Sequence, residues 1–291
     1  LIERRFPMKI SDIIKEKGFA ASLEVFPPKN DLNIDTAIPL LDELSTLKPD
    51  FISVTCGAGG TIQSDNTAKL CAHIKENYDT EPVAHFTCIT STKQQVADRL
   101  ALLKEKGIEN VLALRGDRPI EGLSISPEYT YAKELIKEIK AEDFCVAAAC
   151  YPESHIDCGD LDAEIEHTKQ KVEAGASFLI SQLSFSSDIF LNYLSKLRNA
   201  GVDAPFLAGI MPILSKAQVE RMIYMCGVSL PGNIVRILAK YQDNKEDLEK
   251  AGIEYACSQI ETLKKEGVDG IHIYTMNKPH IAKALMQAAR Q

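Results

Sequence analysis

The sequence predicts a single TIM (β/α)8 barrel, an α/β fold in which eight parallel strands alternate with helices. Eight short apolar runs recur along the 291 residues, and most of them end in polar or turn residues. Helical patterns lie between these runs, and a strict alternation of strand and helix indicates parallel strands joined by right-handed crossovers. A chain of this length commonly forms one such barrel. The same alternation of strands and helices also fits an open, doubly wound sheet, which is the alternative fold.

The expected elements follow one another at similar spacing. The strands are expected at residues 22–28, 51–55, 83–88, 110–117, 145–152, 178–182, 206–212 and 271–275. The helices between and after them are expected at residues 34–47, 65–77, 92–106, 127–141, 161–174, 188–200, 216–226 and 282–289. Glycine stands just past three of these helices, at Gly107, Gly175 and Gly201, where a left-handed residue often ends a helix. These glycines mark the repeating period of the barrel.

One interval breaks the period. Residues 214–270, between the seventh and eighth strands, contain two further helical patterns at 232–241 and 245–266, without a linker rich in Pro, Gly or Ser. We therefore expect extra helices inserted between the seventh and eighth strands of one catalytic domain, 20–291. Residues 1–19 are expected to form an N-terminal extension and a leading helix. Because the chain begins with Leu and Met8 precedes the helical stretch, residues 1–7 are interpreted as upstream sequence.

The composition excludes several classes of protein. A net charge of -8 argues against a nucleic-acid partner, which requires a basic face. No apolar run approaches the roughly 18 residues of a membrane span. Eight cysteines without a CxxC pair, and no secretory leader, predict reduced core thiols in a cytoplasmic protein. His155 and Cys158 have a spacing that suits a metal, but no second pair accompanies them, so no metal site is expected.

Polar side chains at the strand ends are the candidates for chemistry, because the catalytic groups of such barrels gather at the carboxyl ends of the strands. This rule selects Glu24, Thr55, His85, Arg115, Asp117, Tyr151, His155, Gln182 and Thr275. The set contains no serine elbow, no HExxH motif, no Walker lysine and no strand-borne lysine for a Schiff base. A bound organic cofactor is therefore expected to carry the reaction.

Eight motifs occur in order between about residues 20 and 285. They are LEVFPPK at 23–29, SVTCGA at 53–58, HFTC at 85–88, ALRGD at 113–117, YPExH at 151–155, AGA at 174–176 leading to SQ at 181–182, GIMP at 209–212 and YTMN at 274–277. Together they resemble the bacterial-type methylenetetrahydrofolate reductases. The resemblance implies a cytoplasmic flavoprotein of one-carbon metabolism and methionine biosynthesis. Non-covalent FAD would take hydride from NADH or NADPH and pass it from flavin N5 to 5,10-methylenetetrahydrofolate in a ping-pong reaction.

The resemblance also implies roles for residues at matching positions. Glu24 would be the catalytic acid that protonates the leaving amine, and Asp117 would lie between flavin and pterin. The implied cofactor contacts are Thr55, Cys56, Ala58, His85, Arg115, Gly116, Asp117, Tyr131, Ala132, Tyr151, His155, Glu164, His167 and Lys171. The implied substrate contacts are Glu24, Asp117, Gln182, Gln218 and Lys278, the last standing where many relatives have Arg.

Structural interpretations of the same residues stay open. Glu24 would also suit a structural ion pair inside the barrel, His85 a satisfied core histidine, and Glu164 and Lys171 a solvated helix face. Three other functions remain as well: a reductase subunit of a larger electron-transfer assembly with a partner subunit, a flavin- or folate-binding barrel without turnover, and a cofactor-free lyase. The long helix at 245–266 is a plausible contact surface, so a homo-oligomer is expected.

Overall fold

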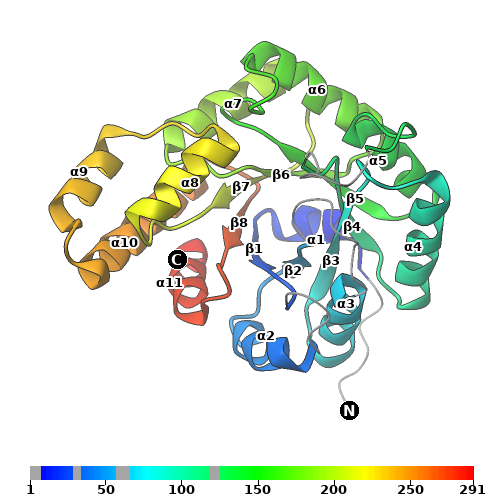
Figure 1. Ribbon diagram of the computed structural model, residues 1–291, viewed down its shortest axis with the longest axis horizontal. Helices are drawn as coiled ribbons and strands as arrows, with labels where there is room; N and C mark the ends of the chain where they lie inside the picture. The colour runs from blue at the N-terminus through cyan, green and yellow to red at the C-terminus, as the bar shows by residue number, and fades with distance from the viewer. Residues whose placement is uncertain (1–7, 29–33, 57–65, 118–124) are drawn as a thin grey trace.

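Eight parallel strands close into a barrel in the order of the chain, in a computed structural model that describes residues 8–28, 34–56, 66–117 and 125–291 (Figure 1). The strands are β1 (Ala20–Val25), β2 (Phe51–Val54), β3 (Glu81–Thr87), β4 (Asn110–Leu114), β5 (Cys145–Cys150), β6 (Phe178–Ser181), β7 (Phe206–Ile210) and β8 (Gly270–Tyr274). β1 pairs with both β2 and β8, and this pairing closes the ring. The predicted barrel is thereby confirmed, and the open sheet is excluded.

The helices surround the barrel, with the inserted ones on one side (Figure 1). They are α1 (Ile10–Lys17), α2 (Ile38–Ser45), α3 (Asn66–Asn77), α4 (Lys93–Glu105), α5 (Ala132–Ala141), α6 (Leu161–Glu173), α7 (Ser187–Asn199), α8 (Lys216–Cys226), α9 (Gly232–Tyr241), α10 (Lys245–Lys265) and α11 (Pro279–Arg290), with a 3-10 turn η1 (Ile34–Ala37) before α2. The expected extra helices are α9 and α10. They follow α8 in the interval between β7 and β8.

Two helices start later than their sequence patterns predict, and local capping explains both. The pattern at 34–47 divides into η1 and α2, because Pro39 stands in the first turn of α2 and its fixed φ suits a helix start. The pattern at 127–141 becomes helical only at α5. There the Glu134 carboxylate accepts hydrogen bonds from the backbone amides of Thr130 and Tyr131, which satisfies donors at the helix start.

The leading helix α1 closes the amino-terminal end of the barrel. Ile10, Ile13 and Ile14 are buried and form a core cluster with inward side chains of the strands, Phe51 and Phe178 among them. Asn110 fixes the helix start, since its Oδ1 accepts from the Ile10 amide at 2.9 Å and its Nδ2 donates to the Met8 carbonyl at 3.2 Å. Each buried isoleucine contributes about 1.5–3 kcal/mol to folding. With this end closed, we expect the site at the carboxyl end, where barrels of this kind bind their ligands.

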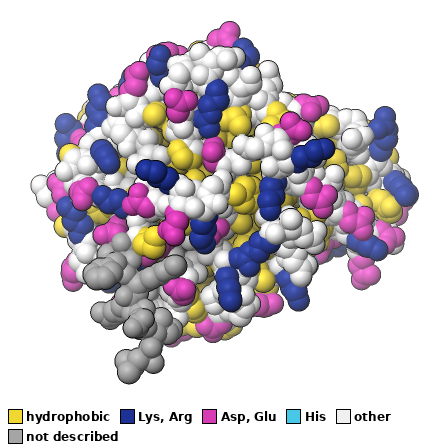
Figure 2. All heavy atoms as spheres, turned by 180° about the vertical axis from the view of Figure 1, so that it is seen from behind, with side chains coloured by type: hydrophobic (Ala, Val, Ile, Leu, Met, Phe, Trp, Pro, Cys, Tyr) yellow, Lys and Arg dark blue, Asp and Glu magenta, His cyan; other side chains and the backbone are white. Residues whose placement is uncertain are grey.

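The surface carries mixed charges. Lys and Arg side chains are interspersed with Asp and Glu over the face opposite to that of Figure 1 (Figure 2). Among the described helices, none combines the length and the apolar character needed to cross a bilayer. All eight cysteines are unpaired thiols, and Cys71, Cys88, Cys145 and Cys150 are buried in the core. The other four are half-buried, so the expectation of core thiols is met by half of them.

Candidate active site

Glu24 lies inside the carboxyl half of the barrel, where β1 is paired on both sides. Its neighbours in register are Ser53 on β2 and Tyr274 on β8, and it is 7% exposed. Its Oε2 lies 3.5 Å from Nε2 of His85 and 3.6 Å from Nε2 of His272. Both separations exceed those of ordinary hydrogen bonds. The carboxyl group therefore lies between two imidazoles. Among the residues that the structure describes, no Arg or Lys forms an ion pair with Glu24.

His272 on β8 ties this carboxyl group to a buried hydrogen-bond network. Its Nδ1 lies 2.7 Å from Oγ of Ser22 and its Nε2 lies 3.3 Å from Oγ of Ser53. The ring stacks on Phe51 with centroids 5.8 Å apart, and the residue is 0% exposed. Sequence reasoning missed His272. In the sequence His272 stands between two isoleucines of the eighth strand. This pattern does not tell whether the ring points into the barrel or toward the helices.

His85 on β3 is buried, but it is not a satisfied core histidine. Within the described part of the chain its Nε2 has no hydrogen-bond partner, and the Glu24 carboxyl oxygen Oε2 lies 3.5 Å away. Burial lowers the pKa of His85 to about 4, because the opposing effect of the Glu24 charge is smaller and His272 also disfavours protonation. The ring is therefore neutral at neutral pH. An orphaned ring nitrogen is costly, so a ligand or water that bonds it would stabilise this site.

The residues after β4 form a fixed turn at the barrel mouth. The Arg115 carbonyl accepts from the amides of Cys88 and Ile89 at 3.2 and 2.8 Å. Gly116 follows with φ of +91°, and a Cβ there would lie 3.1 Å from Cγ2 of Ile89. This backbone conformation and the close packing both favour glycine. The turn leaves Asp117 exposed, where its negative charge acts on the pKa values of Tyr151, His155 and Cys226.

The loop after β5 and helix α6 bring Lys171 and Glu164 beside the rings of Tyr151 and His155. Lys171 Nζ donates to the Ala149 carbonyl at 2.9 Å, lies 3.7 Å from Oε1 of Glu164 and stands 5.2 Å above the Tyr151 ring. The Tyr151 ring also contacts His155 edge to face at 4.8 Å. Glu164 is 2% exposed and the Lys171 side chain 14%. The solvated helix face is therefore the wrong interpretation for both.

The pKa shifts of Glu164 and His155 show that the charged residues near the ends of β4 and β5 act on one another. Burial raises the pKa of Glu164, and the charge of Lys171 is the largest of the effects that oppose it. Burial lowers the pKa of His155, and the Arg115 charge lowers it further. Arg115 itself donates to Oδ2 of Asp157 at 3.1 Å. The ends of β4 and β5 and the start of α6 thus share one electrostatic environment.

Other implied cofactor positions are less informative. Tyr131 is 53% exposed and Ala132 is buried at the start of α5. Thr55 is held by its amide, which donates to the Val25 carbonyl at 3.0 Å. Burial raises the pKa of the Cys56 thiol, which lies 4.0 Å from Oγ1 of Thr87. Ala58 lies outside the described residues.

The implied substrate contacts are engaged in different ways. Gln182 is half-buried after β6, and its Oε1 accepts from the Leu183 amide at 2.9 Å. Both ends of the Gln218 amide bond the loop before α8: Oε1 accepts from the Leu214 amide at 2.7 Å and Nε2 donates to the Pro212 carbonyl at 3.2 Å. Within the described part of the chain, no hydrogen bond joins Gln218 to the Glu24 group. Gln218 therefore fixes this loop.

Lys278 contacts a residue that sequence reasoning did not single out. Its Nζ lies 3.2 Å from Oε2 of Glu249 on α10, and Nε2 of His280 lies 2.7 Å from Oε1 of the same carboxylate. These contacts lower the pKa of Glu249, with the His280 hydrogen bond as the largest cause. The inserted helix thus reaches the segment after β8. Tyr274, also missed, donates from its hydroxyl to the Ser181 carbonyl at 2.8 Å and bridges β8 to β6.

Comparisons with known proteins support one family. The family described as "Methylenetetrahydrofolate reductase" matches residues 9–290. The chain is 32% identical over 265 residues to 5,10-methylenetetrahydrofolate reductase of Escherichia coli (strain K12), which covers 91% of this chain and 88% of that protein. It is 31% identical over 291 residues to methylenetetrahydrofolate reductase 1 of Schizosaccharomyces pombe, which covers 96% of this chain and 48% of that protein.

The chain therefore spans about half the length of the fission yeast relative and most of the length of the bacterial one. A solved structure supports the fold. An uncharacterized protein from Clostridium thermocellum that binds two copies of 5-methyl-5,6,7,8-tetrahydrofolic acid aligns over 95% of this chain and 98% of its own, with a TM-score of 0.64 and 16% identity. At this identity, the likeness concerns the fold alone.

Proposed function

The chain belongs to the methylenetetrahydrofolate reductase family, and from this premise we propose that it reduces 5,10-methylenetetrahydrofolate to 5-methyltetrahydrofolate. In this proposal FAD is the bound cofactor and NADH or NADPH is the electron donor. The observation that carries it is the buried Glu24 carboxyl group at the mouth of the barrel, between His85 and His272. A reductive ring opening requires a proton donor.

Glu24 would supply the proton. The five-membered ring of the folate opens when its C–N bond breaks, and the departing amine nitrogen then has to be protonated. The carbon left behind accepts hydride as a methylene iminium. When bound, the flavin supplies that hydride. General acid catalysis by a positioned side chain is worth roughly a hundred- to ten-thousand-fold in rate, so the loss of this group is expected to be large.

His272, which is hydrogen-bonded to Ser22, would return a proton to Glu24 after each turnover. His272 lies 3.6 Å from the Glu24 carboxylate on one side and 2.7 Å from Ser22 on the other. An imidazole carries two ring nitrogens that can each bind or release a proton, so it suits the return of a proton to a carboxyl group that has released one. His272 touches no reacting atom in this account, and it acts through Glu24.

The residues present fit a flavin dinucleotide. The cofactor carries a pyrophosphate, and a chain with a net charge of -8 needs local cations to attract it. Arg115 after β4 and Lys171 on α6 would supply these charges. The buried Nε2 of His85, which has no hydrogen-bond partner among the described residues, is available to a ligand. The positive φ of Gly116 sets the turn after β4 that ends in Asp117. Tyr151 and His155 would complete the contacts.

Asp117 and the loop residues would act on the folate. Asp117 is exposed at the mouth, where its negative charge would favour a cationic iminium. Gln182 has a half-buried amide that offers a donor and an acceptor to a pterin edge. Lys278 would attract the glutamate tail in competition with Glu249. Gln218 holds the loop before α8 through its two backbone hydrogen bonds, and its amide keeps one further donor and one further acceptor for a substrate contact.

A single spectroscopic experiment tests this function. The purified protein is expected to be yellow, its flavin absorption should bleach anaerobically with NADH or NADPH, and 5,10-methylenetetrahydrofolate should restore the colour. A protein without flavin would contradict the proposal. Flavin that dithionite reduces but nicotinamides do not, and that the folate then reoxidises, would instead identify a subunit that takes its electrons from a partner.

A further inference from the structure

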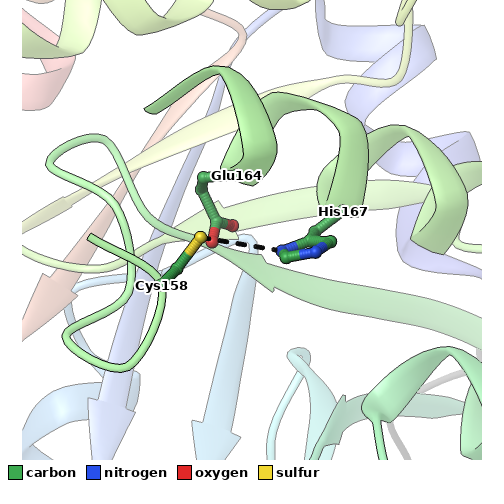
Figure 3. Close-up of side chains that lie close together, drawn as sticks. All are labelled: Cys158, Glu164 and His167. Atoms are coloured by element: carbon green, nitrogen blue, oxygen red, sulfur yellow. Dashed lines mark hydrogen bonds between the residues drawn. The ribbon is translucent and has the colours of Figure 1, made fainter. Parts of the chain in front are cut away.

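Cys158, Glu164 and His167, here called the Cys158 cluster, bring three kinds of metal-ligand side chain together. One ligand atom from each residue lies within 4.8 Å of the other two. Cys158 comes from the loop between β5 and α6, while Glu164 and His167 lie one turn apart on α6 and so share a face of that helix. Figure 3 shows the thiol beside the carboxylate and the imidazole.

The loop presents Cys158 to the helix in a defined position. The amides of Cys158 and Gly159 donate to the His155 carbonyl at 2.7 and 3.1 Å, which closes the loop into a turn. Asp160 then caps α6 by accepting from the Ala163 amide at 2.6 Å. This turn fixes the thiol over the first turns of α6.

We propose that the Cys158 cluster binds Zn²⁺ or a similar thiophilic divalent cation. Cys sulfur, His nitrogen and a carboxylate oxygen are the ligands that Zn²⁺ takes in tetrahedral sites, and sites with three protein ligands keep a fourth position for water or another ligand. A thiolate ligand disfavours Mg²⁺ and Ca²⁺, which prefer oxygen. The ligand set differs from the one considered from the sequence. His155 is not a member, because the ligand atoms that lie together are those of Cys158, Glu164 and His167.

The distances require only a small adjustment. Cys158 Sγ lies 4.0 Å from Nδ1 of His167. Tetrahedral Zn²⁺ with its usual bond lengths places a sulfur and a nitrogen ligand about 3.6 Å apart. His167 is exposed and Cys158 half-buried, so both side chains have room to close this gap. Glu164 is buried and accepts from Oγ1 of Thr168 at 3.3 Å, a contact that orients the carboxylate.

Lys171 is the charge that opposes a bound cation, since its Nζ lies 3.7 Å from Oε1 of Glu164. Two facts offset this repulsion. Binding converts the Cys158 thiol to a thiolate and releases its proton to solvent, so thiolate and carboxylate together neutralise the divalent ion. Lys171 also has its own acceptor in the Ala149 carbonyl at 2.9 Å. The lysine therefore need not lose its hydrogen bond when the ion binds.

Glu164 and His167 are also among the residues implied at the flavin, so the ion and the flavin would exclude each other. The test therefore uses the full chain freed of flavin and metal. Titration with Co²⁺ is expected to give a thiolate-to-metal charge-transfer band that saturates at one equivalent and that Zn²⁺ abolishes. The band reports a cysteine ligand directly and does not depend on enzyme activity.

Variants locate the ion. The band should disappear in Cys158→Ser, and the dissociation constant for Co²⁺ should rise at least tenfold in His167→Gln, whose side chain is exposed. The matched control is Cys226→Ser, another half-buried thiol, which should bind as the unaltered chain does. A missing band in the unaltered chain, or a band that persists in Cys158→Ser, would overturn the proposal. Neither result bears on the reductase reaction.

Discussion

Oε2 of Glu24 lies 3.6 Å from Nε2 of His272, although the two residues are 248 positions apart in the chain. The pairing of β1 with β8 brings them together, because Ser22 and His272 are partners in that register and Glu24 lies two residues further along β1. Both side chains are almost fully buried. The closure of the barrel thus brings together a carboxyl group and an imidazole that no local segment contains.

His272 is expected to matter for the folate half-reaction only. In His272→Gln the amide keeps hydrogen-bonding capacity toward Ser22 and Ser53 but cannot exchange a proton with Glu24. Reoxidation of the reduced flavin by the folate should slow by roughly tenfold or more, and its pH dependence should change, whereas reduction by NADH should not. Stopped-flow traces of the two half-reactions measure this. Equal slowing of both would show that the substitution only disturbs packing.

His85 should make the protein less stable in mild acid. Its pKa is lowered to about 4 in the folded chain, against 6.5 unperturbed. Between these pH values the unfolded chain binds a proton that the folded chain does not, so the free energy of unfolding falls as the pH falls. The full effect is on the order of 3 kcal/mol. Urea unfolding from pH 7 to 4 should show a shallower decline for His85→Gln, and an unchanged slope would contradict the assignment.

Gly116→Ala should lower both stability and flavin content. The positive φ of +91° costs an L-residue about 1–2 kcal/mol, and the new Cβ would press on Ile89 and Thr87. The matched control is Gly107→Ala, where φ is +69° but a Cβ has nothing within 4 Å. Urea unfolding should show a loss in both variants, larger for Gly116, with flavin lost in Gly116→Ala alone. Full flavin content in that variant would remove the turn from the cofactor site.

Lys278 and Glu249 should affect folate binding in opposite directions. Removing the ammonium in Lys278→Ala should raise the KM for the folate roughly fivefold, as expected for a partly exposed charge contact of about 1 kcal/mol. Glu249→Gln should lower that KM, because it releases Lys278 from its 3.2 Å contact. Both effects should shrink at high salt. A KM that is unaffected by either change would place Lys278 outside the substrate site.

The sequence predicted the barrel because each of the eight apolar runs forms one strand. It singled out Glu24 as a candidate because a carboxylate within an apolar run is costly to bury. It could not predict His272. Strands of a parallel barrel are buried on both faces, so the period of two that marks an inward side chain is lost. The contact of Lys278 with Glu249 could not be predicted either. It depends on how the inserted helix α10 packs near the segment after β8, and the sequence pattern does not show that packing.

The central claim is that Glu24 donates the proton that opens the folate ring. Glu24→Gln removes the acid while keeping the size of the side chain, and the test follows its two half-reactions separately under anaerobic conditions. The account predicts normal flavin content, normal reduction by NADH, and reoxidation by 5,10-methylenetetrahydrofolate that is slower by roughly a hundredfold or more. Reoxidation at the rate of the unaltered protein, or equal slowing of both half-reactions, would contradict it.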